Sequence, residues 1–278
     1  MSELNTESAL PPRNHRLRRG VSLLPSLFTV GNLSCGYFAV VSTLKGTPRG
    51  FDEASLAIGF AFLFDALDGR IARVTGTTSE FGKQFDSLAD VISFGIAPAM
   101  LAFTWGVHNL FSPLPGMDRN VYWLGLIVTA TFLLCCAWRL ARFNIEGMAP
   151  GQDSRYFVGL PTPAAAAMIA APIHTLKEPV QDWRFALGWI ALIAALAALM
   201  TSTVRYYGFK DINLRRRRSS LVVVLVGLFF WSFVALSEYV PFLLAATYVL
   251  SGVSVHAFRA LRRRAGPPPP QAPSDASH

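Results

Sequence analysis

Four aspartates, Asp65, Asp68, Asp86 and Asp90, lie close together in a chain that is otherwise largely apolar. The first two are three residues apart and the last two are four apart, and on a helix either spacing places both side chains on one face. Carboxylate oxygens are ligands for hard cations, and no histidine or cysteine lies in this stretch. The residue types therefore favour binding of Mg²⁺, Mn²⁺ or Ca²⁺.

Carboxylates that converge in an apolar setting repel one another, so they hold either protons or cations. Two divalent ions about 3.5–4 Å apart, bridged by shared carboxylates, stabilise both the attacking and the leaving oxygen at phosphorus. The hypothesis is therefore a two-metal site for phosphoryl transfer. The alternative is a set of helix-end charges and solvated turn residues. It is less favoured, because random placement rarely puts four acids at matched depth between apolar flanks.

A helical hairpin is the element predicted to position these aspartates. Gly76 is a helix-stop residue, and Thr77 followed by Glu80 has the pattern of a capping box that opens the next helix. The two aspartate pairs lie at similar distances from this turn, on either side of it. If the helices run antiparallel, Asp65, Asp86 and Asp90 reach similar depth, Asp68 lies slightly nearer the turn, and the four carboxylates converge.

The chain has 278 residues, of which 52% are hydrophobic and only 15% are charged. This charged share is well below the ordinary value of about 25% for soluble proteins, and apolar stretches long enough to span a bilayer recur. We therefore predict an all-α membrane protein, a bundle of about eight transmembrane helices. Their approximate ranges are 26–44, 53–74, 79–106, 121–144, 160–176, 184–204, 219–237 and 240–260.

Most of the 25 lysines and arginines fall on the side of the membrane that would hold both termini and the aspartate turn. This bias predicts cytoplasmic termini and a site that faces the cytoplasm. The net charge of +8 is therefore assigned to topology and to membrane lipids rather than to nucleic acid. We expect no cleavable signal peptide, because the first apolar run continues into a full span.

Four regions follow from this organisation. Residues 1–25 are predicted to be a basic cytoplasmic segment, for which an interfacial helix and a plain topology signal are equally favoured. A core of six spans covers 26–204. A basic cytoplasmic loop and two further spans cover 205–261, and a proline-rich tail, expected to be unstructured, covers 262–278.

Small residues and one arginine lie between the aspartate pairs. Gly69, Ala72 and Gly82 lack bulky side chains, so they could open a groove in which a flat or charged group approaches the backbone. Close packing between helices explains them equally well. Arg73 could hold a phosphate or diphosphate through its planar fork, or it could anchor the helix at the positively charged side of the membrane.

The whole stretch follows the pattern D-x2-D-G-x2-A-R-x8-G-x3-D-x3-D across residues 65–90. This pattern resembles the signature of the CDP-alcohol phosphatidyltransferase family at every fixed position. The resemblance implies that a CDP-linked lipid donates its phosphatidyl group to an alcohol while CMP leaves. It also implies two divalent ions held by the four aspartates, Asp90 as general base, and a homodimer. The residues that would line the nucleotide pocket are Gly69, Ala72, Arg73 and Gly82.

Further segments resemble one branch of that family, the membrane-embedded phosphatidylserine synthases. The matching segments are NLSCGY at 32–37, DSLADVISFGIAP at 86–98, RLARFN at 139–144 and GLPTPAAAA at 159–167. This resemblance implies CDP-diacylglycerol as donor, L-serine as acceptor and phosphatidylserine as product. It also implies a place in the inner membrane of a bacterium.

Polar side chains in the matching segments are candidates for binding the acceptor or a phosphate: Asn32, Arg139, Arg142 and Asn144. The two arginines are three residues apart on one helical face and could pair the serine carboxylate or a donor phosphate. A topology role for the arginines is at least as well supported. A buried asparagine in a membrane helix can equally bond a neighbouring helix.

Two other functions remain open at this point. The same fold could use glycerol phosphate, an inositol compound or choline as the acceptor, since Arg139 and Arg142 could hold a phosphorylated alcohol. A cation or proton transporter is the alternative from another class, because acids within a membrane often mark an ion path. It is less favoured, because the acids cluster towards one face and no internal repeat is visible.

Overall fold

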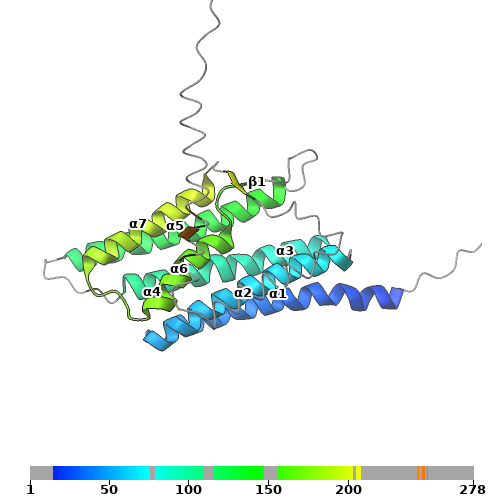
Figure 1. The fold of residues 1–278 in the computed structure, drawn as a ribbon, viewed down its shortest axis with the longest axis horizontal. Helices are drawn as coiled ribbons and strands as arrows, with labels where there is room; N and C mark the ends of the chain where they lie inside the picture. Colours follow the sequence, from blue (N-terminus) through cyan, green and yellow to red (C-terminus); the bar gives the residue numbers. More distant parts are fainter. Residues whose placement is uncertain are drawn as a thin grey trace, which may run out of the picture.

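The computed structural model describes residues 15–75, 79–108, 110, 116–146, 156–202 and 205–207, together with Leu243, Ala246, Thr247 and Val249. Its helices are α1 (His15–Thr43), α2 (Pro48–Thr75), α3 (Glu80–Asp90), the π-helical turn η1 (Val91–Ile96), α4 (Ala97–Gly106), α5 (Met117–Glu146), α6 (Thr162–Leu176) and α7 (Trp183–Thr201). Two short strands, β1 (Tyr156–Val158) and β2 (Arg205–Tyr207), complete the described elements. The helices run roughly along one direction (Figure 1).

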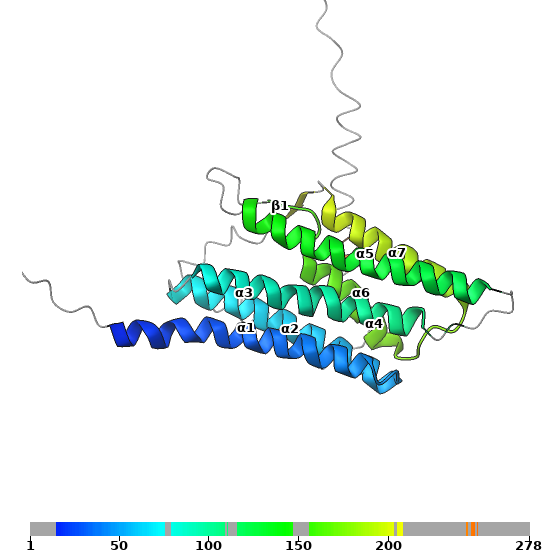
Figure 2. The same cartoon turned by 180° about the vertical axis from the view of Figure 1, so that it is seen from behind.

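The helices form a bundle in which α1 packs most extensively against α2, and α5 against α7. Seen from either side, the α1–α2 pair and the α5–α7 pair form the two edges of the bundle, with α3, α4 and α6 between them (Figures 1 and 2). Helix α6 packs on α2, where the Nδ1 atom of His174 lies 2.6 Å from the Oδ1 atom of Asp52. Helix α3 packs against α1.

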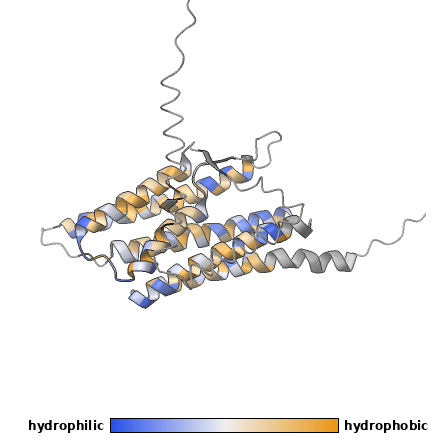
Figure 3. Ribbon diagram, viewed as in Figure 1, coloured by the Kyte–Doolittle hydropathy of each residue, from blue (hydrophilic) through white to orange (hydrophobic). Residues whose placement is uncertain are grey.

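The predicted first six spans are confirmed as helices. Three of the described helices are long and apolar enough to cross a membrane: Glu80–Gly106, Met117–Ile145 and Trp183–Thr201. Hydrophobic residues run along the bundle, and hydrophilic ones gather mainly towards helix ends (Figure 3). The chain is therefore an integral membrane protein built of helices. The last two predicted spans, 219–237 and 240–260, lie outside the described residues except at the four isolated positions.

Helices α3 and α4 form one continuous rod joined by the widened turn η1. Pro98 lies in the first turn of α4. It has no N–H to donate to the carbonyl of Phe94, and its ring would clash there in an ordinary helix. The widened turn just before Pro98 relieves this conflict. The sequence analysis predicted the span but not this turn.

The start of α3 differs from the sequence prediction. Ser79, rather than Thr77, is the N-cap residue, and its Oγ accepts a hydrogen bond of 3.0 Å from the N–H of Gly82. Both candidates are hydroxyl residues of the same short run, so composition alone could not separate them. Gly76 and Thr77 lie outside the described residues.

The two strands are an addition to the predicted all-α fold. Strand β1 pairs antiparallel with β2, with Tyr156 opposite Tyr207 and Val158 opposite Arg205. The residues of β1 lie between two predicted spans and follow no long alternating pattern that would reveal a sheet. The ribbon joins the segment before α6 to the segment after α7.

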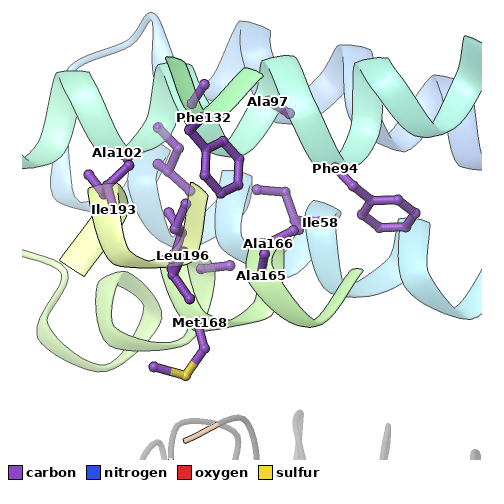
Figure 4. Close-up of a cluster of buried hydrophobic side chains, with 14 of the residues drawn as sticks. Ile58, Phe94, Ala97, Ala102, Phe132, Ala165, Ala166, Met168, Ile193 and Leu196 are labelled. Carbon is purple, nitrogen blue, oxygen red and sulfur yellow. The ribbon is translucent and has the colours of Figure 1, made fainter. Parts of the chain in front are cut away.

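The core lies between α2, α4, α5, α6 and α7. Ala165, Ala166, Ala170 and Ala171 of α6 are buried, and their small side chains allow close helix packing. Val249, far along the chain, is also buried in this core, and Ala246 packs against it. Figure 4 labels Ile58, Phe94, Ala97, Ala102, Phe132, Ala165, Ala166, Met168, Ile193 and Leu196 of this cluster.

Candidate active site

Three of the four aspartates converge in the structure. Asp65 comes from α2, and Asp86 and Asp90 come from α3. One carboxylate oxygen of each lies within 4.8 Å of an oxygen of the other two. The predicted convergence of carboxylates from the two helices therefore holds for Asp65, Asp86 and Asp90.

Asp68 is held slightly apart from this group. Its side chain is buried, and its Oδ2 accepts a hydrogen bond from the hydroxyl of Thr29 on α1. It still lies near enough to interact electrostatically with Asp86 and Asp90. Asp68 therefore belongs to the same acidic region, with one oxygen already engaged by α1.

The residues fit a divalent cation. Oδ1 of Asp86 is buried and has no hydrogen-bond partner within the described part of the chain. Leaving a buried acceptor unsatisfied costs about 1–3 kcal/mol, and more when it is charged. A cation among Asp65, Asp86 and Asp90 would satisfy this oxygen and offset the repulsion between the carboxylates. The donor set contains only oxygen, which suits a hard ion.

Asn32 of α1 is fully buried beside the aspartates. Its Nδ2 donates a 3.0 Å hydrogen bond to Oδ1 of Asp90, while its own backbone carbonyl accepts a 2.9 Å bond from the hydroxyl of Ser93 in η1. The sequence left substrate binding and helix packing as two possible roles of Asn32. The structure ties its amide to the proposed general base.

Asn144, near the end of α5, also bonds another helix. Its Nδ2 donates to the Oγ of Ser87 at 2.8 Å, and that hydroxyl donates to the carbonyl of Lys83 at 3.0 Å. This chain of bonds fastens α5 to α3 one residue away from Asp86. Arg139 and Arg142, on the same part of α5, are half-buried.

The residues expected to line a nucleotide pocket lie on either side of the hairpin. Gly69 is exposed on α2, and Gly82 is half-buried in the first turn of α3. A Cβ atom at Gly82 would lie 3.1 Å from the Oγ of Ser79. Ala72 and Arg73 belong to the last turn of α2, and their side chains lie outside the described part of the structure.

Sequence reasoning missed Thr29 and Ser93, which bind Asp68 and the backbone of Asn32. A signal was present for Thr29. It lies three residues before Asn32 in an apolar stretch, so the two polar side chains share one face of α1. Nothing in the sequence indicates that Ser93 faces α1, because the widened turn η1 changes the facing of the residues after Asp90.

The fold and the site together define a helical membrane protein that gathers carboxylates from an antiparallel hairpin. A sequence model of the CDP-alcohol phosphatidyltransferase family matches residues 22–200. The chain belongs to this family, as its aspartate pattern predicted, and it is an enzyme of the phosphatidyltransferase class.

Several relatives carry the name CDP-diacylglycerol–serine O-phosphatidyltransferase. The Helicobacter pylori protein is 33% identical over 214 residues, which cover 75% of this chain and 81% of the relative. The Saccharomyces cerevisiae protein is 34% identical over 159 residues, covering 54% of this chain and 53% of the relative. These names confirm the resemblance to the serine-using branch.

A solved structure of Mycobacterium tuberculosis phosphatidylinositol phosphate synthase in complex with manganese and citrate is also similar. It is 22% identical in sequence, with a TM-score of 0.44, and the match covers 67% of this chain and 83% of that chain.

Proposed function

We propose that this enzyme transfers the phosphatidyl group of CDP-diacylglycerol to L-serine, giving phosphatidylserine and CMP. The observation that carries the proposal is the convergence of Asp65, Asp86 and Asp90 in a membrane bundle whose relatives are named for this reaction. The substrates fit the site in chemical terms. The donor diphosphate is anionic and needs cations, and the acyl chains of the donor need access from the lipid.

Divalent cations are the cofactor that the acidic region supports. We assign two ions, Mg²⁺ or Mn²⁺, with Ca²⁺ as a further option, to Asp65, Asp68, Asp86 and Asp90. When bound, such ions neutralise the diphosphate and stabilise the charge that develops at phosphorus. The unsatisfied oxygen of Asp86 supports this assignment from the structure.

Asp90 is the residue that we assign as general base. Its carboxylate would accept the proton of the serine hydroxyl as the serine oxygen forms a bond to the phosphorus that carries diacylglycerol. The bond from that phosphorus to the oxygen bridging it to CMP breaks, and CMP leaves with the electron pair. Burial of Asp90 beside Asn32 keeps this carboxylate fixed and limits the access of water.

The surrounding residues complete the proposed site. Gly69, Ala72, Arg73 and Gly82 would accommodate the nucleotide, with Arg73 holding a phosphate. Arg139 and Arg142 of α5 would form ion pairs with the serine carboxylate or with a phosphate of the donor. Asn144, through Ser87, would hold this end of α5 against α3.

The arrangement in the membrane is part of the same proposal. We place both termini and the active site on the cytoplasmic side of a bacterial inner membrane, with eight spans and a homodimeric assembly. The proposed regions are a basic segment at 1–25, the catalytic core at 26–204, a loop with two spans at 205–261 and a tail at 262–278. The charge bias of the loops supports this orientation.

The decisive experiment measures CMP release by the purified full-length chain in lipid nanodiscs with CDP-diacylglycerol and Mn²⁺. Serine, glycerol 3-phosphate, inositol 1-phosphate and choline are tested as separate acceptors. We expect turnover with serine and formation of phosphatidylserine, and no turnover after chelation of the metal with EDTA. Turnover with another alcohol and none with serine would overturn the assigned acceptor while retaining the reaction class.

A further inference from the structure

The environment of Asn32 distinguishes it from the other polar residues of the membrane helices. Its side chain is fully buried, and burying an amide is unfavourable unless it gains hydrogen bonds. Within the described residues, its Oδ1 has no partner, and its Nδ2 donates a hydrogen bond to Asp90. The amide of Asn32 therefore orients the carboxylate of Asp90.

The backbone at Asn32 is fixed as well. The hydroxyl of Ser93 donates to the carbonyl of Asn32 at 2.9 Å, so two hydrogen bonds join one residue of α1 to the segment that begins at Asp90. One turn further along α1, Gly36 lies against Ser93, and a Cβ atom at this glycine would come within 2.9 Å of the Ser93 Cα. The absence of a side chain at Gly36 allows α1 to approach η1 this closely.

These contacts lead to a role that rests on the proposed function. We infer that Asn32 is a positioning residue that holds Oδ1 of Asp90, and so fixes the direction of its second carboxylate oxygen toward the metal and the acceptor alcohol. A hydrogen bond to one oxygen restricts rotation of the carboxylate, so the direction of its other oxygen is restricted as well. The residues that hold a metal ligand in this way commonly affect metal affinity as strongly as activity.

The test compares Asn32→Leu with the wild-type chain. Leucine has the same number of side-chain heavy atoms in the same branched arrangement, so the substitution removes the hydrogen bond while keeping the branching of the side chain. Binding of Mn²⁺ is measured by electron paramagnetic resonance without substrates, on the full-length chain in nanodiscs. We expect the Mn²⁺ affinity to fall by about 10–100-fold.

A kinetic measurement at saturating Mn²⁺ separates positioning from binding of serine. We expect kcat to fall by about 10-fold or more, while the KM for serine stays within a factor of about 3 of wild type, since Asn32 orients the base rather than binding the acceptor. Ser93→Ala should lower both Mn²⁺ affinity and kcat in the same direction but less, because it loosens only the backbone bond. Ser34→Ala, which removes a hydroxyl bonded to the carbonyl of Val30 on the same helix, is the matched control and should change neither.

Three results would overturn the inference. Wild-type Mn²⁺ affinity and kcat in Asn32→Leu would show that the bond is not needed. A rise in the KM for serine with unchanged kcat would assign Asn32 to the acceptor. If Asn32→Leu fails to fold, equal effects of Ser93→Ala and Ser34→Ala would reject the role. If the wild-type chain does not use serine, the proposed acceptor fails, but the Mn²⁺ titration still tests Asn32.

Discussion

Each aspartate of the acidic region has a different immediate environment, and this difference predicts different consequences of substitution. Asp90 is held by Asn32, Asp68 by Thr29, and Asp86 has a buried oxygen with no partner among the described residues. An asparagine keeps the size of an aspartate but removes its charge. Aspartate-to-asparagine variants therefore separate the loss of charge from the loss of packing.

Asp90→Asn should abolish serine-dependent CMP release, because the amide cannot accept the proton of the acceptor. A general base contributes about 10²–10⁴-fold, so kcat should fall by at least that range. Binding of CDP-diacylglycerol, measured by equilibrium titration in nanodiscs, should be largely retained because most carboxylates remain. Turnover close to that of the wild type would remove Asp90 from the role of base.

Asp65→Asn should weaken both Mn²⁺ binding and donor binding, because Asp65 is the member of the three-carboxylate group supplied by α2. Calorimetric titration with Mn²⁺, with and without CDP-diacylglycerol, measures both effects. Asp118→Asn, which alters an exposed acid in the first turn of α5, is the control. Equal Mn²⁺ affinity in the two variants would contradict the proposed metal site.

The convergence of Asp65, Asp86 and Asp90 could be predicted from the sequence, because helical spacing places each pair on one face of its helix. The partners of those aspartates could not. Whether Asn32 faces Asp90 depends on how α1 is rotated about its own axis, and that rotation is set by packing against α2 and η1. The hydrogen bond of Asn144 to Ser87 likewise depends on how α5 lies against α3.

At the scale of elements, the contact between α1 and η1 makes Gly36 sensitive to any added side chain. Gly36→Ala should force the helices apart, because a Cβ atom there would lie too close to the backbone of Ser93. Overpacking of this kind costs about 1–3 kcal/mol. We expect a lower midpoint of thermal unfolding together with lower turnover.

Gly188→Ala on α7 is the matched control, since a Cβ atom at Gly188 would meet no heavy atom within 4 Å. Thermal unfolding followed by circular dichroism in detergent should show no loss of stability for this variant, because alanine favours a helix over glycine. If the two alanine variants are equally stable and equally active, the close approach of α1 and η1 has no energetic importance.

Apolar runs predicted the bounds of the described helices to within about five residues, except that α1 begins at His15 rather than near residue 26. Three local features required tertiary information. Several neighbouring hydroxyl residues could cap α3, and the structure has Ser79 as the N-cap. The β1–β2 pair joins segments far apart in the chain. The turn η1 lies just before Pro98, which cannot donate a backbone hydrogen bond, and it packs Ser93 against α1.

At the scale of the whole molecule, the charge bias predicts which connections face the cytoplasm. Green fluorescent protein fused after residue 78, 150 or 215 should fluoresce, since it folds in the cytoplasm. Alkaline phosphatase fused after residue 46, 113 or 179 should be active, since it requires the opposite side. The reverse pattern of reporter activity would invert the proposed orientation and place the acidic region outside the cytoplasm.

The surplus residue that widens η1 makes the length of this segment as important as its composition. Each residue of an α-helix advances the chain by about 100° around the axis. Loss of a single codon within 91–96 would restore a regular helix and swing Leu101 and Trp105 away from the core that buries them. In-frame deletions here should therefore be far less tolerated than substitutions. Natural variants of this segment should differ in residue type but keep its length, and so its helical register.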